Sequence, residues 1–480
     1  MIIAGVALSV LAVLAVGLAV ARRVGGDSTN FLVAGRSLAL PLSAAGLMGQ
    51  AVDSNATLGN TDLAASLGFW AGAALPLGLG LCLLLTGLFF AAPMNRMGLL
   101  SLPDFYRITY GRGVELAASV LTIGSFCVLL AGNLVAGGYL FERFLGTSYP
   151  VGVLLIVAVV LTYTAAGGMF SDAYTALVQV GITVVGSLAL LGWTAARYGI
   201  GAPEGMGPLD FGQLADPGRG AVVNWATLVA LGVGDVVAID FMQRILSARS
   251  PRTARRACFL GAAGTAVVGV PYALVALSTR DVVSGPGPVL FALLEGHAPA
   301  VLTVLVLSAI VAASCSTANG ALLGTAAVAV RNIGGLDSGP GVLRRVRLAM
   351  LPVVAVAVLI ALRVPQTGVL LTLAFDVMLA GLAVPFVLGH WWSRGTPAAA
   401  GASIGVGVAV RLVLFVLTPT FYGAPNTLLH VPNSLVGPGF DGWATFLAPL
   451  VSLAVFVVVS LLRPAPAGEA ALARSAEVVR

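Results

Sequence analysis

The sequence predicts an all-α integral membrane protein with about thirteen membrane-spanning helices. Of its 480 residues, 59% are hydrophobic and only 9% are charged, whereas soluble domains are roughly 45–50% apolar and about 25% charged. A membrane helix needs about 20 apolar residues, and this chain carries thirteen apolar runs of suitable length between its charges. This composition excludes a soluble enzyme, a nucleic-acid-binding protein and a disordered scaffold. The predicted partners are the lipid bilayer and a small-molecule solute.

Each apolar run predicts one helix. In chain order the predicted helices span residues 2–21, 39–65, 68–92, 113–141, 150–166, 173–194, 221–243, 257–277, 298–330, 348–362, 368–388, 398–418 and 443–462. The ninth run is longer than one crossing requires, so that helix is predicted to tilt or to extend beyond the membrane.

The arginines predict the orientation of the chain, because cytoplasmic loops of membrane proteins are rich in basic residues. With the N-terminus outside and the C-terminus inside, the outer loops hold five arginines, Arg143, Arg197, Arg219, Arg280 and Arg363. The inner loops and the tail hold nineteen, Arg22, Arg23, Arg36, Arg96, Arg107, Arg112, Arg244, Arg249, Arg252, Arg255, Arg256, Arg331, Arg344, Arg345, Arg347, Arg394, Arg463, Arg474 and Arg480. The predicted location is the plasma membrane, crossed many times, with an uncleaved first helix.

No linker separates soluble domains. We expect a peripheral N-terminal helix and inner loop (1–38), a ten-helix core (39–388), two peripheral helices (389–463) and a disordered cytoplasmic tail (464–480). The outer segments 198–220 and 419–442 are rich in Gly and Pro and are expected to cover the outer mouth. Four isolated cysteines and three scattered histidines predict neither a disulfide framework nor a zinc site.

The second predicted helix is too polar to be a continuous lipid-facing helix. Residues 49–62 read GQAVDSNATLGNTD, and irregular backbone at membrane depth survives only against protein or water. The sequence therefore predicts a helix broken near residues 49–55, with Asp53 at the middle of the membrane.

The seventh predicted helix repeats this pattern. It carries Gly232, Gly234 and Asp235, then Asp240, before it ends at Gln243-Arg244. Two Gly-interrupted, acid-bearing helices five spans apart are typical of two inverted five-helix repeats that meet at a central binding site. The repeats would cover about 39–197 and 221–388.

Hydroxyl side chains in the ninth predicted helix suggest a cation site. Ser316 and Thr317 are adjacent, so their hydroxyls diverge, which suits two ligands of one small cation better than one packing stripe. Carbonyl oxygens released by an unwound helix would supply further ligands.

Five segments in the right order resemble the sodium:solute symporter family, which includes sodium/proline and sodium/sugar carriers. They are 31–38 (FLVAGRSL), 101–105 (SLPDF), 163–168 (YTAAGG) followed by Thr175 and Gln179, Gln243-Arg244 followed by Ala248, Ala254 and Arg255, and 316–323 (STANGALL). The resemblance implies a ten-helix core of the LeuT type and sodium-coupled solute symport by alternating access, not an enzyme.

The family's common cation site implies here a sodium ion bound by the carbonyls of Gly49, Val52 and Ala313 and the hydroxyls of Ser316 and Thr317. This register aligns the second helix on Gly59; aligning it on the acid would select Ala51 and Ser54 instead. Two departures stand out: Asp53 replaces the usual Ser, and Thr175-Ala176 replaces the Thr-Asp pair of many members, with Asp172 one turn earlier.

Buried acids guide the solute hypothesis. The candidate solute-binding residues are Gln50, Asp53, Ser54, Asn55, Asp235 and Asp376. Carboxylates in a cavity repel anions and favour a cationic or zwitterionic amine, with Asp53 as its counter-ion. Arg411 is a candidate partner for a buried acid, and Asp240 is expected to pair with Arg244.

Other classes stay open at this point. A proton-coupled symporter would use Asp53 or Asp235 to carry the proton. A channel or an intramembrane aspartyl hydrolase using Asp53 and Asp235 is a further alternative, although neither a filter sequence nor a protease motif accompanies them.

Overall fold

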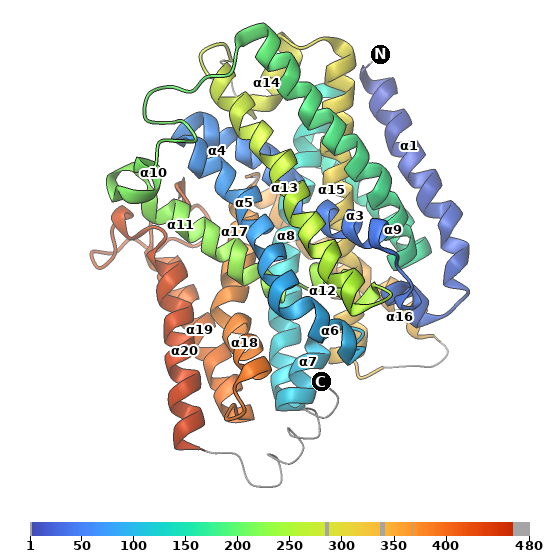
Figure 1. The fold of residues 1–480 in the computed structure, drawn as a ribbon, viewed down its shortest axis with the longest axis vertical. Coiled ribbons are helices and arrows are strands. Elements are labelled where there is room, and N and C mark those ends of the chain that lie inside the picture. Colours follow the sequence, from blue (N-terminus) through green and yellow to red (C-terminus); the bar gives the residue numbers. More distant parts are fainter. Residues whose placement is uncertain (1, 284–287, 337–340, 367, 464–480) are drawn as a thin grey trace.

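A computed structural model describes residues 2–283, 288–336, 341–366 and 368–463, and these residues form a bundle of membrane-length helices (Figure 1). The predicted disordered tail, 464–480, lies outside the described residues. The helices are α1 (Ile2–Val20), α2 (Ser28–Val33), α3 (Leu40–Ala51), α4 (Asn60–Leu67), α5 (Phe69–Leu85), α6 (Ala91–Met97), α7 (Pro103–Tyr110), α8 (Arg112–Leu145), α9 (Tyr149–Tyr198), α10 (Gly212–Ala215), α11 (Ala221–Val229), α12 (Ile239–Ser247), α13 (Pro251–Thr279), α14 (Val289–Gly296), α15 (Ala300–Val328), α16 (Val342–Arg363), α17 (Val369–Met378), α18 (Val384–Trp391), α19 (Pro397–Leu417) and α20 (Trp443–Leu462). One short hairpin pairs β1 (Thr420–Phe421) antiparallel with β2 (Ala424–Pro425).

The thirteen predicted spans are recovered. Within the described residues, ten helices are long and apolar enough to cross a membrane, and the pair α11–α12, bent by 47°, gives an eleventh span. The interrupted pair α3–α4 falls where the second span was predicted. The remaining span is hidden in α9, which has 50 residues and would measure about 75 Å if straight, at about 1.5 Å per residue.

α9 does not continue straight, because it folds back at Gly168. Both of its ends lie near α14: Arg143, just before α9, forms an ion pair with Glu295 (2.8 Å), and the ring of Tyr198 lies 6.5 Å from that of His297. Gly168 has φ +50° and ψ −134°, a conformation that favours glycine. The two arms of α9 are therefore the fifth and sixth predicted spans.

This fold-back gives a first prediction. Gly168→Ala should lower the stability of the protein, because an added Cβ would lie 2.4 Å from the carbonyl oxygen of Phe31 and the backbone strain alone costs on the order of 1–3 kcal/mol. Thermal unfolding in detergent measures this. Gly181→Ala, in the same helix with open space at its Cβ, is the control and should leave the unfolding temperature unchanged; equal midpoints for the two variants would refute the prediction.

The two interrupted spans are joined by backbone hydrogen bonds at one end. Leu38, just before α3, pairs with Ala248, just after α12: the Leu38 N–H donates to Ser247 O (3.1 Å), and the Arg249 N–H donates to Leu38 O (3.0 Å). Because both helices are fixed at this end, their breaks lie at comparable depth in the bundle.

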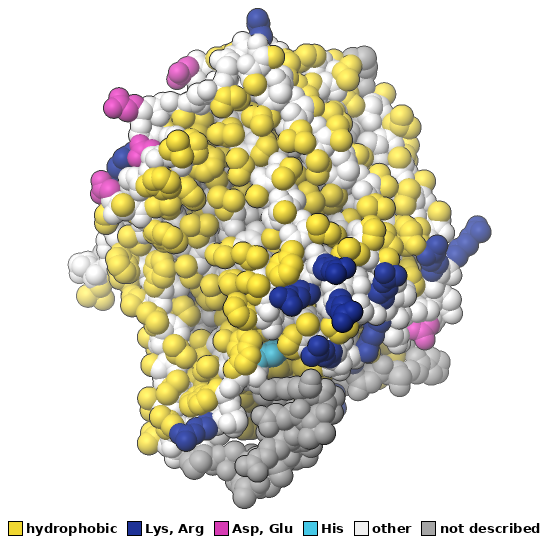
Figure 2. Space-filling view, viewed as in Figure 1, with side chains coloured by type: hydrophobic (Ala, Val, Ile, Leu, Met, Phe, Trp, Pro, Cys, Tyr) yellow, Lys and Arg dark blue, Asp and Glu magenta, His cyan; other side chains and the backbone are white. Residues whose placement is uncertain are grey.

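The surface matches a membrane protein. Figure 2 shows hydrophobic side chains covering most of one face, with arginines gathered toward the end of the molecule that holds α6 and α7 in Figure 1. Large apolar residues such as Leu8, Val120, Leu359 and Leu450 are more than half exposed. In a soluble protein such exposure would be unfavourable, whereas in a bilayer lipid covers these side chains.

Candidate functional site: two interrupted helices and α15

The break in the second span is stabilised by Asp53. α3 ends at Ala51, Val52 leaves the helical region (φ −102°, ψ 70°), and residues Asn55–Gly59 form a wider π-helical turn before α4. Asp53 Oδ1 accepts the N–H of Ala56 (2.7 Å), and Oδ2 accepts the side-chain amides of Asn55 (2.6 Å) and Asn133 (3.1 Å). An aspartate that accepts such bonds caps the helix that follows. The predicted interruption is confirmed, although Gly49 itself is still helical.

α15 presents its two hydroxyls to the end of α3. Thr317 Oγ1 lies 3.3 Å from Gly49 O and 3.4 Å from Gln50 O. A Cβ added to Gly49 would lie 2.7 Å from Ser316 Oγ, so only glycine allows this approach. Gln50 Nε2 donates to Ser316 O (2.7 Å) and holds the two helices together.

The Ser316 hydroxyl is an unexplained polar group. It is buried, and it has no hydrogen-bond partner among the described residues, whereas buried hydroxyls are nearly always paired. Oxygen atoms from a helix end and two hydroxyls are ligands that a hard cation prefers. The two remaining predicted ligands lie nearby along the chain: Val52 at the break itself and Ala313 one turn before Thr317 in α15.

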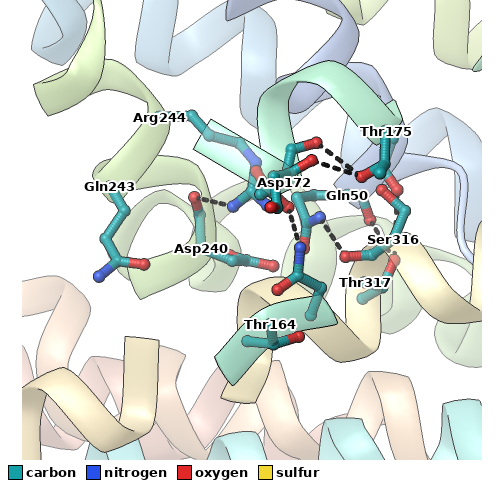
Figure 3. A network of polar contacts seen from close by, with 12 residues as sticks. Gln50, Thr164, Asp172, Thr175, Asp240, Gln243, Arg244, Ser316 and Thr317 are labelled. Atoms are coloured by element: carbon teal, nitrogen blue, oxygen red, sulfur yellow. Dashed lines mark hydrogen bonds and ion pairs between the residues drawn. The ribbon is translucent and has the colours of Figure 1, made fainter. Parts of the chain in front are cut away.

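A second polar layer adjoins this site (Figure 3). Arg244 of α12 forms a buried ion pair with Asp172 of α9 (2.5 Å), and Asn319 of α15 donates to the same carboxylate oxygen (2.9 Å). Arg244 contacts Asp240 only through the backbone carbonyl (2.8 Å). The expected ion pair between Asp240 and Arg244 is therefore wrong: the guanidinium reaches across to α9, where the carboxylate of Asp172 is buried and needs a counter-charge.

The seventh span is interrupted as predicted. After α11, residues Ala230–Gly234 form a π-helical turn and Asp235–Val237 a 3-10 turn, and Ala238 is extended before α12 begins. Asp235 is only 1% exposed. Neither of its carboxylate oxygens has a hydrogen-bond partner in the described part of the chain.

The side chain of Asp376 of α17 is bonded to the C-terminal helices instead of to these residues. It forms a buried ion pair with Arg411 of α19 and accepts the hydroxyl of Thr445 of α20 (3.2 Å). The candidate partnership of Arg411 with a buried acid is thus confirmed. This pair links the core to the two C-terminal helices.

A cavity of about 500 Å³ opens beside α10. Its lining includes Leu75, Asn224, Thr227, Thr372 and Tyr422. Hydrogen bonds join the start of α5 to the segment 199–220. The Phe69 N–H donates to Met206 O (2.9 Å), and Trp70 Nε1 donates to Pro208 O (3.2 Å). This segment therefore forms a fixed wall of the cavity mouth.

The hairpin β1–β2 forms another part of the cavity mouth. Asp441 accepts the N–H groups of Tyr422 (2.8 Å) and Gly423 (2.9 Å), and burial raises the pKa of its carboxyl above the usual value. Of the segment 419–442, which is predicted to cover the outer mouth, Tyr422 and Gly423 line the cavity and are held in place by Asp441.

None of the six candidate solute-binding residues is among those that line this cavity. The nearest link is Asn55, whose Oδ1 accepts the N–H of the lining residue Gly368 (3.1 Å). Gln50 faces α15, and Ser54 donates to Asn133 Oδ1 (2.9 Å). The structure gathers Gln50, Ser54 and Asn55 around Asp53 and α15 and leaves Asp376 outside that group.

Sequence reasoning missed Asn133 of α8. This amide binds Asp53 and Ser54, and the carbonyl of Asn133 accepts the Ser314 hydroxyl (3.4 Å). A lone Asn in the middle of the apolar run 113–141 is the signal that points to it, since a polar side chain at that depth needs partners.

Comparison with solved structures identifies the fold. A Na⁺-coupled sialic acid symporter in a substrate-bound, outward-open state superposes with a TM-score of 0.77 over 97% of this chain and 98% of its own, at 15% identity. Mhp1 is a nucleobase-cation-symport-1 family transporter, solved in a closed conformation with bromovinylhydantoin bound. It superposes with a TM-score of 0.58 over 93% of this chain and 99% of its own, at 16% identity. The fold is thus the LeuT-type fold of these membrane transporters.

Sequence comparison then identifies the family. The model of the sodium:solute symporter family matches residues 31–407, and the chain belongs to that family. The high-affinity choline transporter 1 of Drosophila melanogaster is 23% identical over 78% of this chain and 64% of its own length. The human high affinity choline transporter 1 is 26% identical over 55% of this chain and 48% of its own length. The osmoregulated proline transporter OpuE of Bacillus subtilis is 27% identical over 65% of this chain and 68% of its own length. The matched regions cover less than two thirds of the fly and human proteins.

Proposed function

We propose that this protein is a sodium-coupled symporter that carries a small organic solute across the plasma membrane by alternating access. The observation that carries the proposal is the meeting of α3 and α15. There the hydroxyl of Thr317 contacts the carbonyls of Gly49 and Gln50, and the buried, unpartnered hydroxyl of Ser316 lies against Gly49. We assign the sodium ion to the carbonyls of Gly49, Val52 and Ala313 and the hydroxyls of Ser316 and Thr317.

The transport core of this proposal is the ten-helix unit 39–388, with α1, α19 and α20 at its periphery. Broken helices suit alternating access because their two halves can move separately around a fixed site. The N-terminus lies outside and the C-terminus inside, which places the cavity beside α10 on the outer side and most arginines in the cytoplasm.

The solute of this proposal is a cationic or zwitterionic amine. Asp53, Asp235 and Asp240 bring carboxylates to the two breaks, and a cluster of acids disfavours anions. Choline and proline carriers among the relatives are consistent with this class. A proton-coupled symporter is the second candidate, favoured by the unpartnered carboxylate of Asp235.

Uptake into liposomes that contain the purified full-length protein tests the proposal. Choline, proline and sialic acid would each be offered under an inward sodium gradient, under a potassium gradient and under an inward proton gradient without sodium. We expect accumulation of choline or proline with sodium alone. Uptake driven by protons in the absence of sodium supports the second candidate, and uptake that never exceeds equilibration in any arm indicates a channel.

A further inference from the structure

Asp235 is a buried carboxylate without a counter-charge. The charged groups that interact with it electrostatically are Asp53, at the break after α3, and Asp240, at the start of α12. The thiol of Cys82 of α5 also interacts with its charge. All three are acidic groups. The cations that could have compensated it are committed elsewhere: Arg244 to Asp172 and Arg411 to Asp376.

An ionised carboxylate in such surroundings is unfavourable by several kcal/mol, so the group either binds a proton or acquires a positive partner. Asp53 differs in this respect, because three donors within the chain already satisfy its carboxylate. Among the described residues, no donor bonds to either carboxylate oxygen of Asp235. Asp235 is therefore the acid that needs a partner from outside the protein.

A route to Asp235 begins at the cavity beside α10. Thr227 lines that cavity, and Asp235 lies eight residues further along the same span, just beyond the π-helical turn Ala230–Gly234. Leu75 and Thr372 line the same cavity from α5 and α17. α5 and α17 also pack against the break that carries Asp235, so the cavity and this carboxylate share the same surrounding helices.

Beyond the cavity-lining residues, these spans carry buried apolar side chains. Leu79 of α5, Leu231 and Phe375 of α17 lie at that level and are at most 2% exposed. The elements are closely packed there: a Cβ added to Gly78 would lie 2.8 Å from Leu231 Cβ, and one added to Gly234 would lie 2.4 Å from Phe375 O. A path from the cavity to the carboxylate therefore requires these packed side chains to move.

We propose that Asp235 binds a proton in the solute-free protein and releases it to water when the cationic head of the solute takes its place. The O–H bond of the carboxylic acid breaks, the proton leaves through the cavity, and an ion pair between the carboxylate and the organic cation forms. This inference rests on the proposed function and assigns the counter-ion to Asp235 instead of Asp53. It requires a solute that carries a quaternary ammonium group or a protonated amine.

Two consequences follow. The solute-free protein exchanges between its outward and inward states without an uncompensated charge at its centre. Because proton and solute exclude one another, the affinity for the solute should rise by about tenfold per pH unit as long as the solute-free form is protonated.

Proton release on binding tests this inference. Choline is the probe, added to the full-length protein in lipid nanodiscs with sodium chloride in a weakly buffered solution containing a pH indicator. We expect one proton released per choline bound by the wild type and none by Asp235→Asn. Glu204→Gln, which removes an exposed carboxylate at the cavity mouth, is the matched control and should release protons as the wild type does.

Infrared spectroscopy of the wild type keeps the inference testable if Asp235→Asn does not fold. The carbonyl band of a protonated carboxylic acid should be present without choline and should disappear when choline binds. Absence of proton release from the wild type, uptake of a proton, or equal release by Asp235→Asn would each overturn the inference. Sodium-dependent thermal stabilisation of the same samples, lost in Ser316→Ala, tests the proposed function separately, so the two failures are distinguishable.

Discussion

Replacing Ser316 by Ala and Thr317 by Val should raise the sodium concentration needed to stabilise the protein by about ten- to hundred-fold for each substitution. A bond from a neutral group to a charge contributes about 1.5–3 kcal/mol, and every 1.4 kcal/mol is about a factor of ten in affinity. Both substitutions remove an oxygen that faces the end of α3 and add no bulk. The measurement is the thermal unfolding temperature as sodium chloride replaces potassium chloride at constant ionic strength, since a ligand that binds only the folded state raises that temperature.

Ser314→Ala provides the matched control. Ser314 lies on the same helix, but its hydroxyl donates to Asn133 O and is not assigned to the cation. Its sodium dependence should match the wild type. If Ser314→Ala weakened the response as much as Ser316→Ala, the response would report damage to α15 instead of loss of a ligand.

Arg244→Met should destabilise the protein by about 3–5 kcal/mol, because removing one member of a buried ion pair leaves an uncompensated charge. Arg244 and Asp172 are both 1% exposed, and Asn319 alone would then remain bonded to the carboxylate. Removing the carboxylate as well, in Asp172→Asn with Arg244→Met, should recover much of that loss. Unfolding in mixed micelles, followed by circular dichroism, gives the free energies of unfolding.

The control for this pair is Arg256→Met, which removes an exposed arginine near the start of α13. It should change the free energy of unfolding by less than about 0.5 kcal/mol. A double variant as unstable as Arg244→Met alone would contradict the account, since it would show that the loss arises from packing and not from the unpaired charge.

Much of the fold could be predicted because the membrane simplifies it. Apolar runs bounded by arginines mark the spans, and Gly within a few residues of Asp at membrane depth marks both interruptions. The sequence predicts the fold-back at Gly168 only as a short gap between two spans. That the chain reverses direction at a single residue depends on the backbone conformation of Gly168, which composition does not reveal.

Side-chain partners were harder to predict than backbone breaks. Arg244 is close to Asp240 in sequence, yet it pairs with Asp172 of α9, 72 residues away, because α12 packs against α3 and α15 and its guanidinium reaches past them to α9. Asp53 was predicted as a counter-ion for the solute, whereas the structure shows it bound by three donors of the chain. In each case one partner lies far away in sequence: Asp172 for Arg244, and Asn133 for Asp53.

The central claim is that the end of α3 and the hydroxyls of α15 bind a sodium ion. Equilibrium binding of radioactive sodium to the purified full-length protein tests it most directly, without knowledge of the solute. The account predicts saturable binding by the wild type that is lost when Ser316→Ala and Thr317→Val are combined and retained in Ser314→Ala. Equal sodium binding by the double variant and the wild type, or none by either, would contradict it.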